Sequence, residues 1–213
     1  HTNKILFSLI AQSAAKSGLP ENCLFQAEQR DEISELLSCH ESVDLLIPRG
    51  SNAFVQYIMD HTKIPVMGHA DGICHIYVDK TFDIDKAVPV LIDAKTQYTA
   101  ACNAVETLLV HKDAVDLLMP RLNQALKEHQ IELRATADIA SRYDSIQATE
   151  EDFETEYLDL ILSAKTVENI DEAIVHINQY GSHHTDCIIT EDREAAEYFM
   201  RMVDSAGVYQ NCS

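Results

Sequence analysis

One of the six cysteines, Cys102, lies in a run of small residues directly before an apolar segment. The run is Tyr98–His111, with the letters YTAACNAVETLLVH. Alanines beside the sulfur leave room for a substrate carbonyl, and the apolar residues that follow predict a rigid strand. A thiolate is a strong nucleophile that traps an acyl group as a thioester. Cys102 is therefore a candidate nucleophile, and the alternative is a cysteine buried in the core.

A second candidate site is Arg49-Gly50-Ser51, which follows an apolar run and precedes a helical pattern. Backbone N–H groups at the start of a helix bind phosphates, so this turn could hold part of a nucleotide cofactor. One glycine is a weak fingerprint, and an ordinary strand–helix turn has the same pattern. No metal site is expected at Cys74-His75 or His183-His184, because neighbouring residues on a strand point to opposite faces.

The composition is that of a globular protein without a nucleic-acid or membrane partner. Of the 213 residues, 46% are hydrophobic and 24% are charged, and the net charge is -19. Such a charge repels a phosphate backbone. No apolar run approaches the roughly 20 residues that cross a bilayer, and no secretory signal is recognisable. The cysteines show no CxxC spacing, which favours free thiols in a reducing compartment.

Helical and strand patterns alternate along the chain, and this predicts an α/β fold with mainly parallel sheets. Helices are expected around 5–14, 31–37, 51–59, 85–95, 113–129, 170–180 and 193–203. Strands are expected at 23–25, 43–47, 64–67, 73–78, 106–111, 132–134, 157–164, 187–190 and 207–209.

The best candidate for a domain boundary lies near residues 68–72, where two strand patterns follow each other without a helix between them. We therefore expect two domains, residues 1–70 and 71–213. The chain starts with His instead of Met and ends just after a strand pattern, so we expect an interior segment of a longer polypeptide.

Four segments resemble those of the gamma-glutamyl phosphate reductases, a branch of the aldehyde dehydrogenase superfamily that also forms the C-terminal part of bifunctional pyrroline-5-carboxylate synthases. They are IPRGS (47–51), PVMGHADGICHIYVD (65–79), AACNAVETLLVH (100–111) and YGSHHTDCIITED (180–192). The similarity runs over essentially the whole chain in the same order. It implies an aldehyde-dehydrogenase-like α/β fold. Residues 1–70 would be the later part of a Rossmann-type cofactor domain, and residues 71–213 an α/β catalytic domain.

The resemblance also implies a reaction. Cys102 falls at the position of the catalytic thiol, which would attack gamma-glutamyl phosphate, expel phosphate and form a thioester. NADPH would reduce that thioester to glutamate 5-semialdehyde, a step in proline biosynthesis. Backbone N–H groups near Cys102 and Asn103 could donate to the developing oxyanion. Alternatively, Asn103 is a turn residue that bonds its own backbone.

Further residues acquire roles from the same resemblance. Gly50 and Ser51, with Arg49, would line the cofactor cleft, and Glu156 would bind the ribose beside the nicotinamide. Glu156 is otherwise a solvated acidic residue, and the usual Gly-Pro after that glutamate is replaced by Asp159-Leu160. His69 falls where hydrolytic aldehyde dehydrogenases carry a general-base glutamate, and its replacement suits reduction. His69 could instead contact the leaving phosphate or be a structural turn residue.

The implied partners are the small-molecule substrate and glutamate 5-kinase, either separate or fused, and the full-length protein is expected to be a homo-oligomer. The expected location is the cytoplasm, or the mitochondrion for a fused synthase. Two other functions remain open. One is a non-catalytic binding or scaffold fragment that keeps the fold, and the other is an oxidising, hydrolytic aldehyde dehydrogenase, which His69 disfavours.

Overall fold

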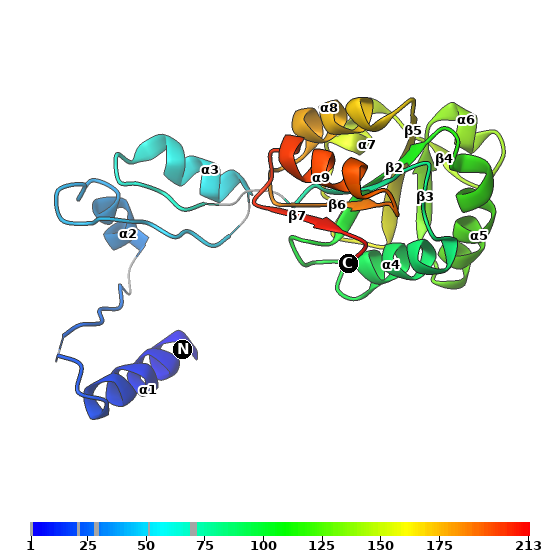
Figure 1. Cartoon of the computed structure of the whole chain (residues 1–213). Helices are drawn as coiled ribbons and strands as arrows, with labels where there is room; N and C mark the ends of the chain where they lie inside the picture. Colours follow the sequence, from blue (N-terminus) through cyan, green and yellow to red (C-terminus); the bar gives the residue numbers. More distant parts are fainter. Residues whose placement is uncertain (1, 21, 28–29, 51, 69–71) are drawn as a thin grey trace. The chain divides into compact units, whose positions relative to one another are not determined.

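The computed structural model describes residues 2–20, 22–27, 30–50, 52–68 and 72–213 (Figure 1). The chain divides into two compact units, residues 1–70 and 71–213. Among the described residues, we find no helix with the length and apolar character that a membrane span requires.

The smaller unit consists of three helices joined by extended segments. The helices are α1 (Thr2–Lys16), α2 (Arg30–Leu36) and α3 (Asn52–His61). The predicted strand at 23–25 is not formed, and the predicted strands at 43–47 and 64–67 meet only in one parallel bridge between Leu46 and Val66. These strand predictions are wrong because an apolar run becomes a strand only beside neighbouring strands.

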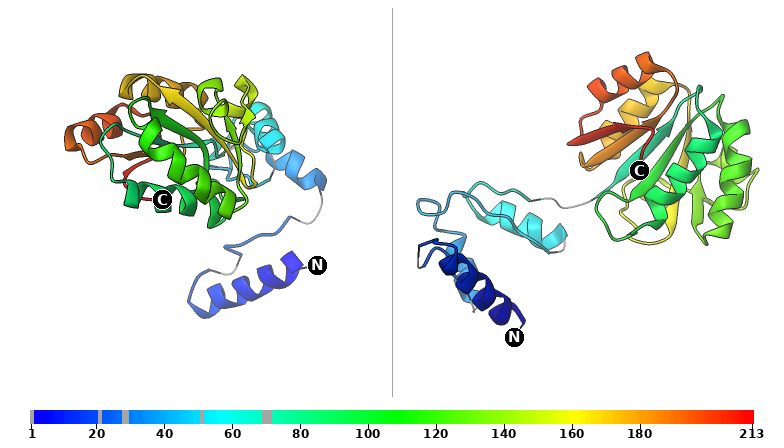
Figure 2. Two further views of the ribbon diagram at one scale, coloured as in Figure 1. Left: turned by 90° about the vertical axis from the view of Figure 1, so that its right-hand side faces the viewer. Right: turned by 60° about the horizontal axis from the view of Figure 1, so that its bottom comes forward.

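The larger unit is built on a sheet of seven strands in the order β4-β3-β5-β2-β1-β6-β7, and all neighbouring pairs are parallel. The strands are β1 (Cys74–Val78), β2 (Val105–His111), β3 (Glu132–Ala135), β4 (Ile146–Gln147), β5 (Ile161–Val167), β6 (Thr185–Ile189) and β7 (Gly207–Gln210). The predicted parallel α/β architecture is confirmed. Figure 2 shows helices on both sides of this sheet.

Six helices connect these strands. They are α4 (Ile84–Thr96), α5 (Val115–Glu128), α6 (Ala137–Ala140), α7 (Glu150–Phe153), α8 (Ile170–Tyr180) and α9 (Arg193–Met202). Three of them begin at a side chain that accepts a hydrogen bond from the first turn: Asp83 for α4, Asn169 for α8 and Asp192 for α9. Such caps satisfy amides that have no partner within the helix.

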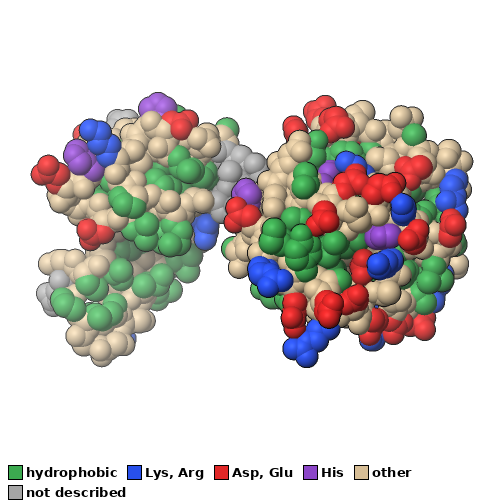
Figure 3. All heavy atoms as spheres, turned by 45° about the horizontal axis from the view of Figure 1, so that its top comes forward, with side chains coloured by type: hydrophobic (Ala, Val, Ile, Leu, Met, Phe, Trp, Pro, Cys, Tyr) green, Lys and Arg blue, Asp and Glu red, His purple; other side chains and the backbone are tan. Residues whose placement is uncertain are grey.

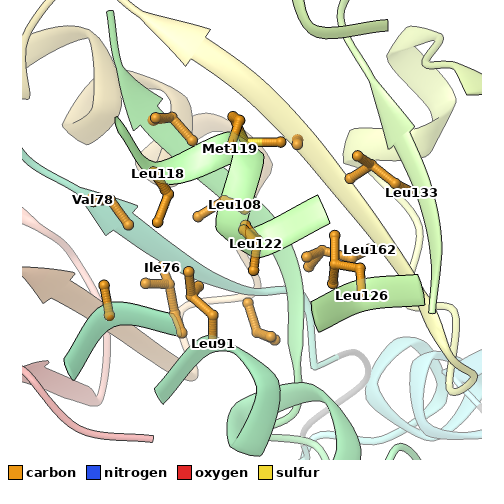
Figure 4. Packing of buried hydrophobic residues seen from close by; sticks show 14 of the residues in the cluster. Ile76, Val78, Leu91, Leu108, Leu118, Met119, Leu122, Leu126, Leu133 and Leu162 are labelled. Carbon is orange, nitrogen blue, oxygen red and sulfur yellow. The ribbon is translucent and has the colours of Figure 1, made fainter. Parts of the chain in front are cut away.

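The sheet separates two hydrophobic cores. On one face, α4 and α5 pack against side chains of the strands, including Ile76, Leu108 and Leu162 (Figure 4). On the other face, α8 and α9 pack against Tyr77 and Leu109. Ile76 and Tyr77 enter different cores because successive strand residues point to opposite faces. Coverage of both faces explains why β1 and β2 are buried throughout.

Most elements predicted for the larger unit are confirmed, with shifted ends. The helix at 170–180 has the predicted bounds, whereas the strand predicted from residue 157 begins at Ile161. The short elements α6, α7 and β4 were not predicted. The segment before β5 is held instead by side-chain hydrogen bonds that its sequence does not reveal.

Candidate active site

Cys102 lies on the connection between α4 and β2, residues 97–104, which we call the Cys102 loop. Two turns shape this loop. The amide of Ala101 donates to the carbonyl of Tyr98 (3.1 Å), and that of Ala104 to the carbonyl of Ala101 (2.9 Å). The side chains of Cys102 and Asn103 are exposed, whereas Ala104 is buried. The loop thus presents its thiol to solvent from a base anchored in the core.

Gly72 brings a second chain segment against this loop. A Cβ atom built on Gly72 would overlap the carbonyl oxygen of Cys102 and would lie 2.7 Å from the Cys102 Cα. It would also lie 2.7 Å from Oε1 of Glu156. Only glycine permits such a close approach of backbone to backbone. Gly72, Cys102 and Glu156 therefore meet at one point.

Cys74, two residues after Gly72, also fixes the Cys102 loop. The thiol of Cys74 donates to the carbonyl of Cys102 at 3.2 Å, and Cys74 pairs with Val105 in the register of β1 and β2. Burial, with a contribution from Asp186, raises the pKa of the Cys74 thiol, so Cys74 stays protonated and keeps its role as donor. The hydrogen bond from Cys74 thus fixes the Cys102 carbonyl relative to β1.

Glu156 is half-buried and belongs to a segment that is braced by Asp152 and Tyr157. The Tyr157 hydroxyl donates to Asp152 Oδ1 (2.8 Å) and lies 2.7 Å from the Ser163 hydroxyl, while Arg134 Nη1 donates to Asp152 Oδ1 (2.9 Å). Burial acts to raise the pKa of Asp152, but the hydrogen bonds from Arg134, Thr149 and Tyr157 outweigh it and hold that pKa at about 2. Asp152 therefore remains a carboxylate and keeps this segment in place.

The three meeting residues all precede strands. Gly72 lies before β1, Cys102 before β2 and Glu156 before β5, and these strands are neighbours in the sheet. The candidate site thus lies at the amino-terminal edge of the sheet. Open α/β sheets usually bind ligands at the carboxyl edge, and the difference follows from the thiol's place on a helix-to-strand connection.

Solvent exposure alone does not single out Cys102. Cys74 and Cys187 are buried, but Cys23, Cys39 and Cys212 are exposed as well. Accessibility therefore does not decide which cysteine is the nucleophile. What distinguishes Cys102 is that its backbone packs against Gly72, where a side chain would clash, and that the Glu156 carboxylate lies beside the same glycine.

The other predicted site residues that the structure describes lie on the Cys102 loop or in the smaller unit. Asn103 lines a cavity of about 290 Å³ together with Cys74, Asp186 and Cys212. Arg49 and Gly50 belong to the smaller unit, where both are exposed on the segment just before α3. A Cβ on Gly50 would come within 2.8 Å of the Phe54 ring.

Two predicted residues, Ser51 and His69, lie outside the described residues. Within the described part of the chain, no group of three or more His, Cys, Asp or Glu side chains is placed to hold a metal ion. The sequence reasoning missed Gly72 and the brace formed by Asp152 and Tyr157. A glycine directly before a buried strand was the available signal for Gly72.

The chain is similar in sequence to proteins named gamma-glutamyl phosphate reductase. The chain is 50% identical over 212 residues to the gamma-glutamyl phosphate reductase of Acetivibrio thermocellus, covering 100% of this chain and 49% of that protein. It is 53% identical over 210 residues to gamma-glutamyl phosphate reductase 1 of a Synechocystis strain, covering 99% and 48% respectively. The chain thus spans about half the length of these relatives.

Solved structures agree with the sequence matches. The crystal structure of gamma-glutamyl phosphate reductase from Thermotoga maritima superposes with a TM-score of 0.91 at 38% identity, covering 99% of this chain and 52% of that one. A lactaldehyde dehydrogenase, at 18% identity, shares the fold with a TM-score of 0.74 over 100% of this chain and 54% of that one. The predicted aldehyde-dehydrogenase-like fold is confirmed. The sequence model of the aldehyde dehydrogenase family matches residues 2–150, more than half of the chain, so the chain belongs to the aldehyde dehydrogenase family.

Proposed function

We propose that this chain carries the nucleophile of an NADPH-dependent gamma-glutamyl phosphate reductase, which makes glutamate 5-semialdehyde and phosphate in proline biosynthesis. The similarity to reductases of that name supports the substrate. The observation that carries the proposal is the meeting of Cys102, Gly72 and Glu156 at one edge of the sheet. At this edge an exposed thiol, a sterically fixed backbone and a carboxylate lie close together.

The loop geometry suits acyl transfer. The exposed Cys102 sulfur attacks the acyl carbon of gamma-glutamyl phosphate, the bond from that carbon to the phosphate oxygen breaks, and phosphate leaves with the bonding electrons. Among the described residues, the amides of Cys102 and Asn103 donate to no protein acceptor. Both are therefore available to stabilise the oxyanion of the tetrahedral intermediate. The product is a thioester on Cys102.

The residues present fit a nicotinamide cofactor. Glu156 is a half-buried carboxylate beside the Cys102 backbone, and a carboxylate suits the hydroxyl groups of a ribose. We also propose Arg49, Gly50 and Ser51 as cofactor-binding residues, on the similarity alone. When bound, NADPH supplies the hydride that reduces the thioester. By the same similarity, we propose that His69 takes the place of the carboxylate base of hydrolytic aldehyde dehydrogenases, which suits reduction, with contact to the leaving phosphate or a structural turn as its alternative roles.

The substrate chemistry names the partner enzyme class. An acyl phosphate forms when a kinase phosphorylates the side-chain carboxylate of glutamate, so a glutamate 5-kinase, separate or fused, supplies it. We further propose that the full-length protein is a homo-oligomer that works in a reducing compartment such as the cytoplasm, which suits a catalytic thiol.

Substitution of the nucleophile tests the proposal. In the complete gene product that contains this chain, turnover is followed in reverse as phosphate-dependent reduction of NADP⁺ by glutamate 5-semialdehyde. Cys102→Ala should lower turnover by about 10⁴-fold or more, because no other group forms the thioester. The exposed cysteines provide matched controls, and Cys23→Ala and Cys39→Ala should turn over like the unaltered protein.

Two results would contradict the proposal. An active Cys102→Ala protein excludes the covalent mechanism. An unaltered protein that binds NADPH but shows no phosphate-dependent turnover favours the alternative of a binding or scaffold fragment.

A further inference from the structure

A buried ion pair lies at the base of the Cys102 loop. Lys95 Nζ donates to Glu106 Oε2 at 2.6 Å, and the two side chains are 0% and 1% exposed. Lysine and glutamate are the residue types least often buried in this way. The Lys95–Glu106 pair therefore needs a physical explanation.

The pair connects the two ends of the loop. Lys95 lies in the last turn of α4, and Glu106 is the second residue of β2. The loop that carries Cys102 runs from one partner to the other. A short, buried contact between its ends limits how far the loop can move relative to the sheet.

The same pair also contacts the segment that carries Glu156. Lys95 Nζ lies 5.9 Å from the centre of the Tyr157 ring. Burial lowers the pKa of the Lys95 ammonium, and the carboxylates of Glu106, Asp159 and Glu156 oppose this by stabilising its charge. Burial likewise raises the pKa of Glu106, to about 7, against the effects of Lys95 and of the Leu158 and Tyr157 amides. Three segments therefore meet at this pair.

Stability alone does not account for these buried charges. Desolvation of two ions costs several kcal/mol, and replacing a buried pair with apolar residues is often neutral or stabilising. The apolar core of α4 and α5 already holds this region together. A pair that is expensive to bury, and that touches both segments of the candidate site, points to a role in positioning.

We propose that the Lys95–Glu106 pair is a positioning pair, which holds the Cys102 loop and the Glu156 segment in the arrangement that thioester chemistry requires. The inference rests on the proposed function, because the pair acts through Cys102 and Glu156. In the proposed reaction the pair forms no bond with the substrate. Its loss should therefore slow the chemical step more than it weakens substrate binding.

The test uses the double variant Lys95→Met/Glu106→Gln in the complete gene product. The value of kcat should fall by about tenfold to a hundredfold, because small displacements of reacting groups have effects of that size. KM should change by less than about threefold. Hydrogen exchange of amides 97–104 and 156–159, measured by mass spectrometry, should quicken by about tenfold or more. Exchange in β5 should stay unchanged.

The chain contains a matched control at the other end of β2. Lys112 and Glu168 form an ion pair of the same residue types at the same 2.6 Å, but their side chains are 49% and 68% exposed. The variant Lys112→Met/Glu168→Gln should leave kcat, KM and the exchange of the Cys102 loop unchanged. A loss of kcat in this control would mean that removing charge, not position, causes the effect.

The outcomes separate the two proposals. Unaltered kcat and unaltered loop exchange in the buried variant overturn the positioning role. Absence of turnover in the unaltered protein contradicts the proposed function alone, and the exchange of amides 97–104 still decides whether the pair fixes the loop. If the double variant does not fold, Glu106→Gln answers the same question, because it removes one charge and keeps a hydrogen-bond acceptor for Lys95.

Discussion

The two units of the chain use similar apolar patterns with different results. In residues 2–68, the apolar stripe of α1 stays at the surface, and Ile5, Leu6, Leu9 and Ile10 are all more than half exposed. In residues 72–213, the corresponding faces of α4 and α5 are buried against the sheet. On the face drawn in Figure 3, hydrophobic side chains reach the surface of the smaller unit, and acidic ones are spread over the larger.

The difference shows what a pattern can and cannot specify. The spacing of apolar residues determines which face a helix will bury, and burial itself depends on what packs against that face. The larger unit supplies seven paired strands, whereas the described part of the smaller unit supplies one bridge. The described part of the smaller unit has correspondingly few buried apolar side chains, among them Leu37, Val55, Ile58 and Ile64.

Hydrogen exchange should reveal this contrast most strongly. Amides of β2 should exchange only when the larger unit unfolds, which costs about 5–15 kcal/mol in typical domains. Amides of α1 should exchange almost freely, because a 15-residue helix without buried residues is marginal in water. Mass spectrometry of peptides from both elements in one sample measures the difference. Equal protection would show that α1 is covered in solution, and the contrast would disappear.

Core truncation should give the next largest effect. Leu118 of α5 is 0% exposed within the core, so Leu118→Ala should lower the free energy of unfolding by about 2–5 kcal/mol. Leu9 of α1 is 56% exposed, and Leu9→Ala, the matched control, should change it by about 0.5 kcal/mol or less. Urea unfolding followed by circular dichroism compares the two. A large cost for Leu9→Ala would mean that a partner buries this face of α1.

The sequence predicted elements well where the signals are local. The helix predicted at 170–180 has its observed bounds, and the structure shows local signals at both ends, with Asn169 capping its start and Gly181 following its end. The strand after Cys102 was equally clear from its apolar residues. The strand prediction at 43–47 is wrong although that run is equally apolar, because the described residues give it one bridge, from Leu46 to Val66, and no further strand to pair with.

The site was predicted in parts and not as a whole. The residue pattern alone indicates Cys102, and the resemblance adds Glu156, but their meeting at Gly72 depends on β1, β2 and β5 being neighbours, which no local pattern reveals. The Lys95–Glu106 pair was missed because charged residues are expected at the surface. Both features depend on the order of strands in the sheet, so they become visible only in the folded structure.

The pH dependence of stability should show a smaller effect, which comes from one buried histidine of the larger unit. Burial, with the nearby charges of His75 and Lys165, lowers the pKa of His176 in the larger unit to about 3. The ring packs against Phe153 and Tyr180 and stays neutral in the folded state. The unfolded chain takes up a proton near the ordinary histidine pKa of about 6.5. The stability that comes from the neutral ring is therefore complete above that pH and is lost as the pH falls from 6.5 towards 3.

Removing this group should flatten the pH dependence of stability below pH 6.5. His176→Phe should reduce the slope of unfolding free energy against pH by up to about 1.4 kcal/mol per pH unit, the contribution of one proton. Urea unfolding at pH 7, 6 and 5 measures each slope. If His176→Phe kept the slope of the unaltered protein, His176 would be protonated in the folded state, and the core on the α8 side would be more open to water than its burial indicates.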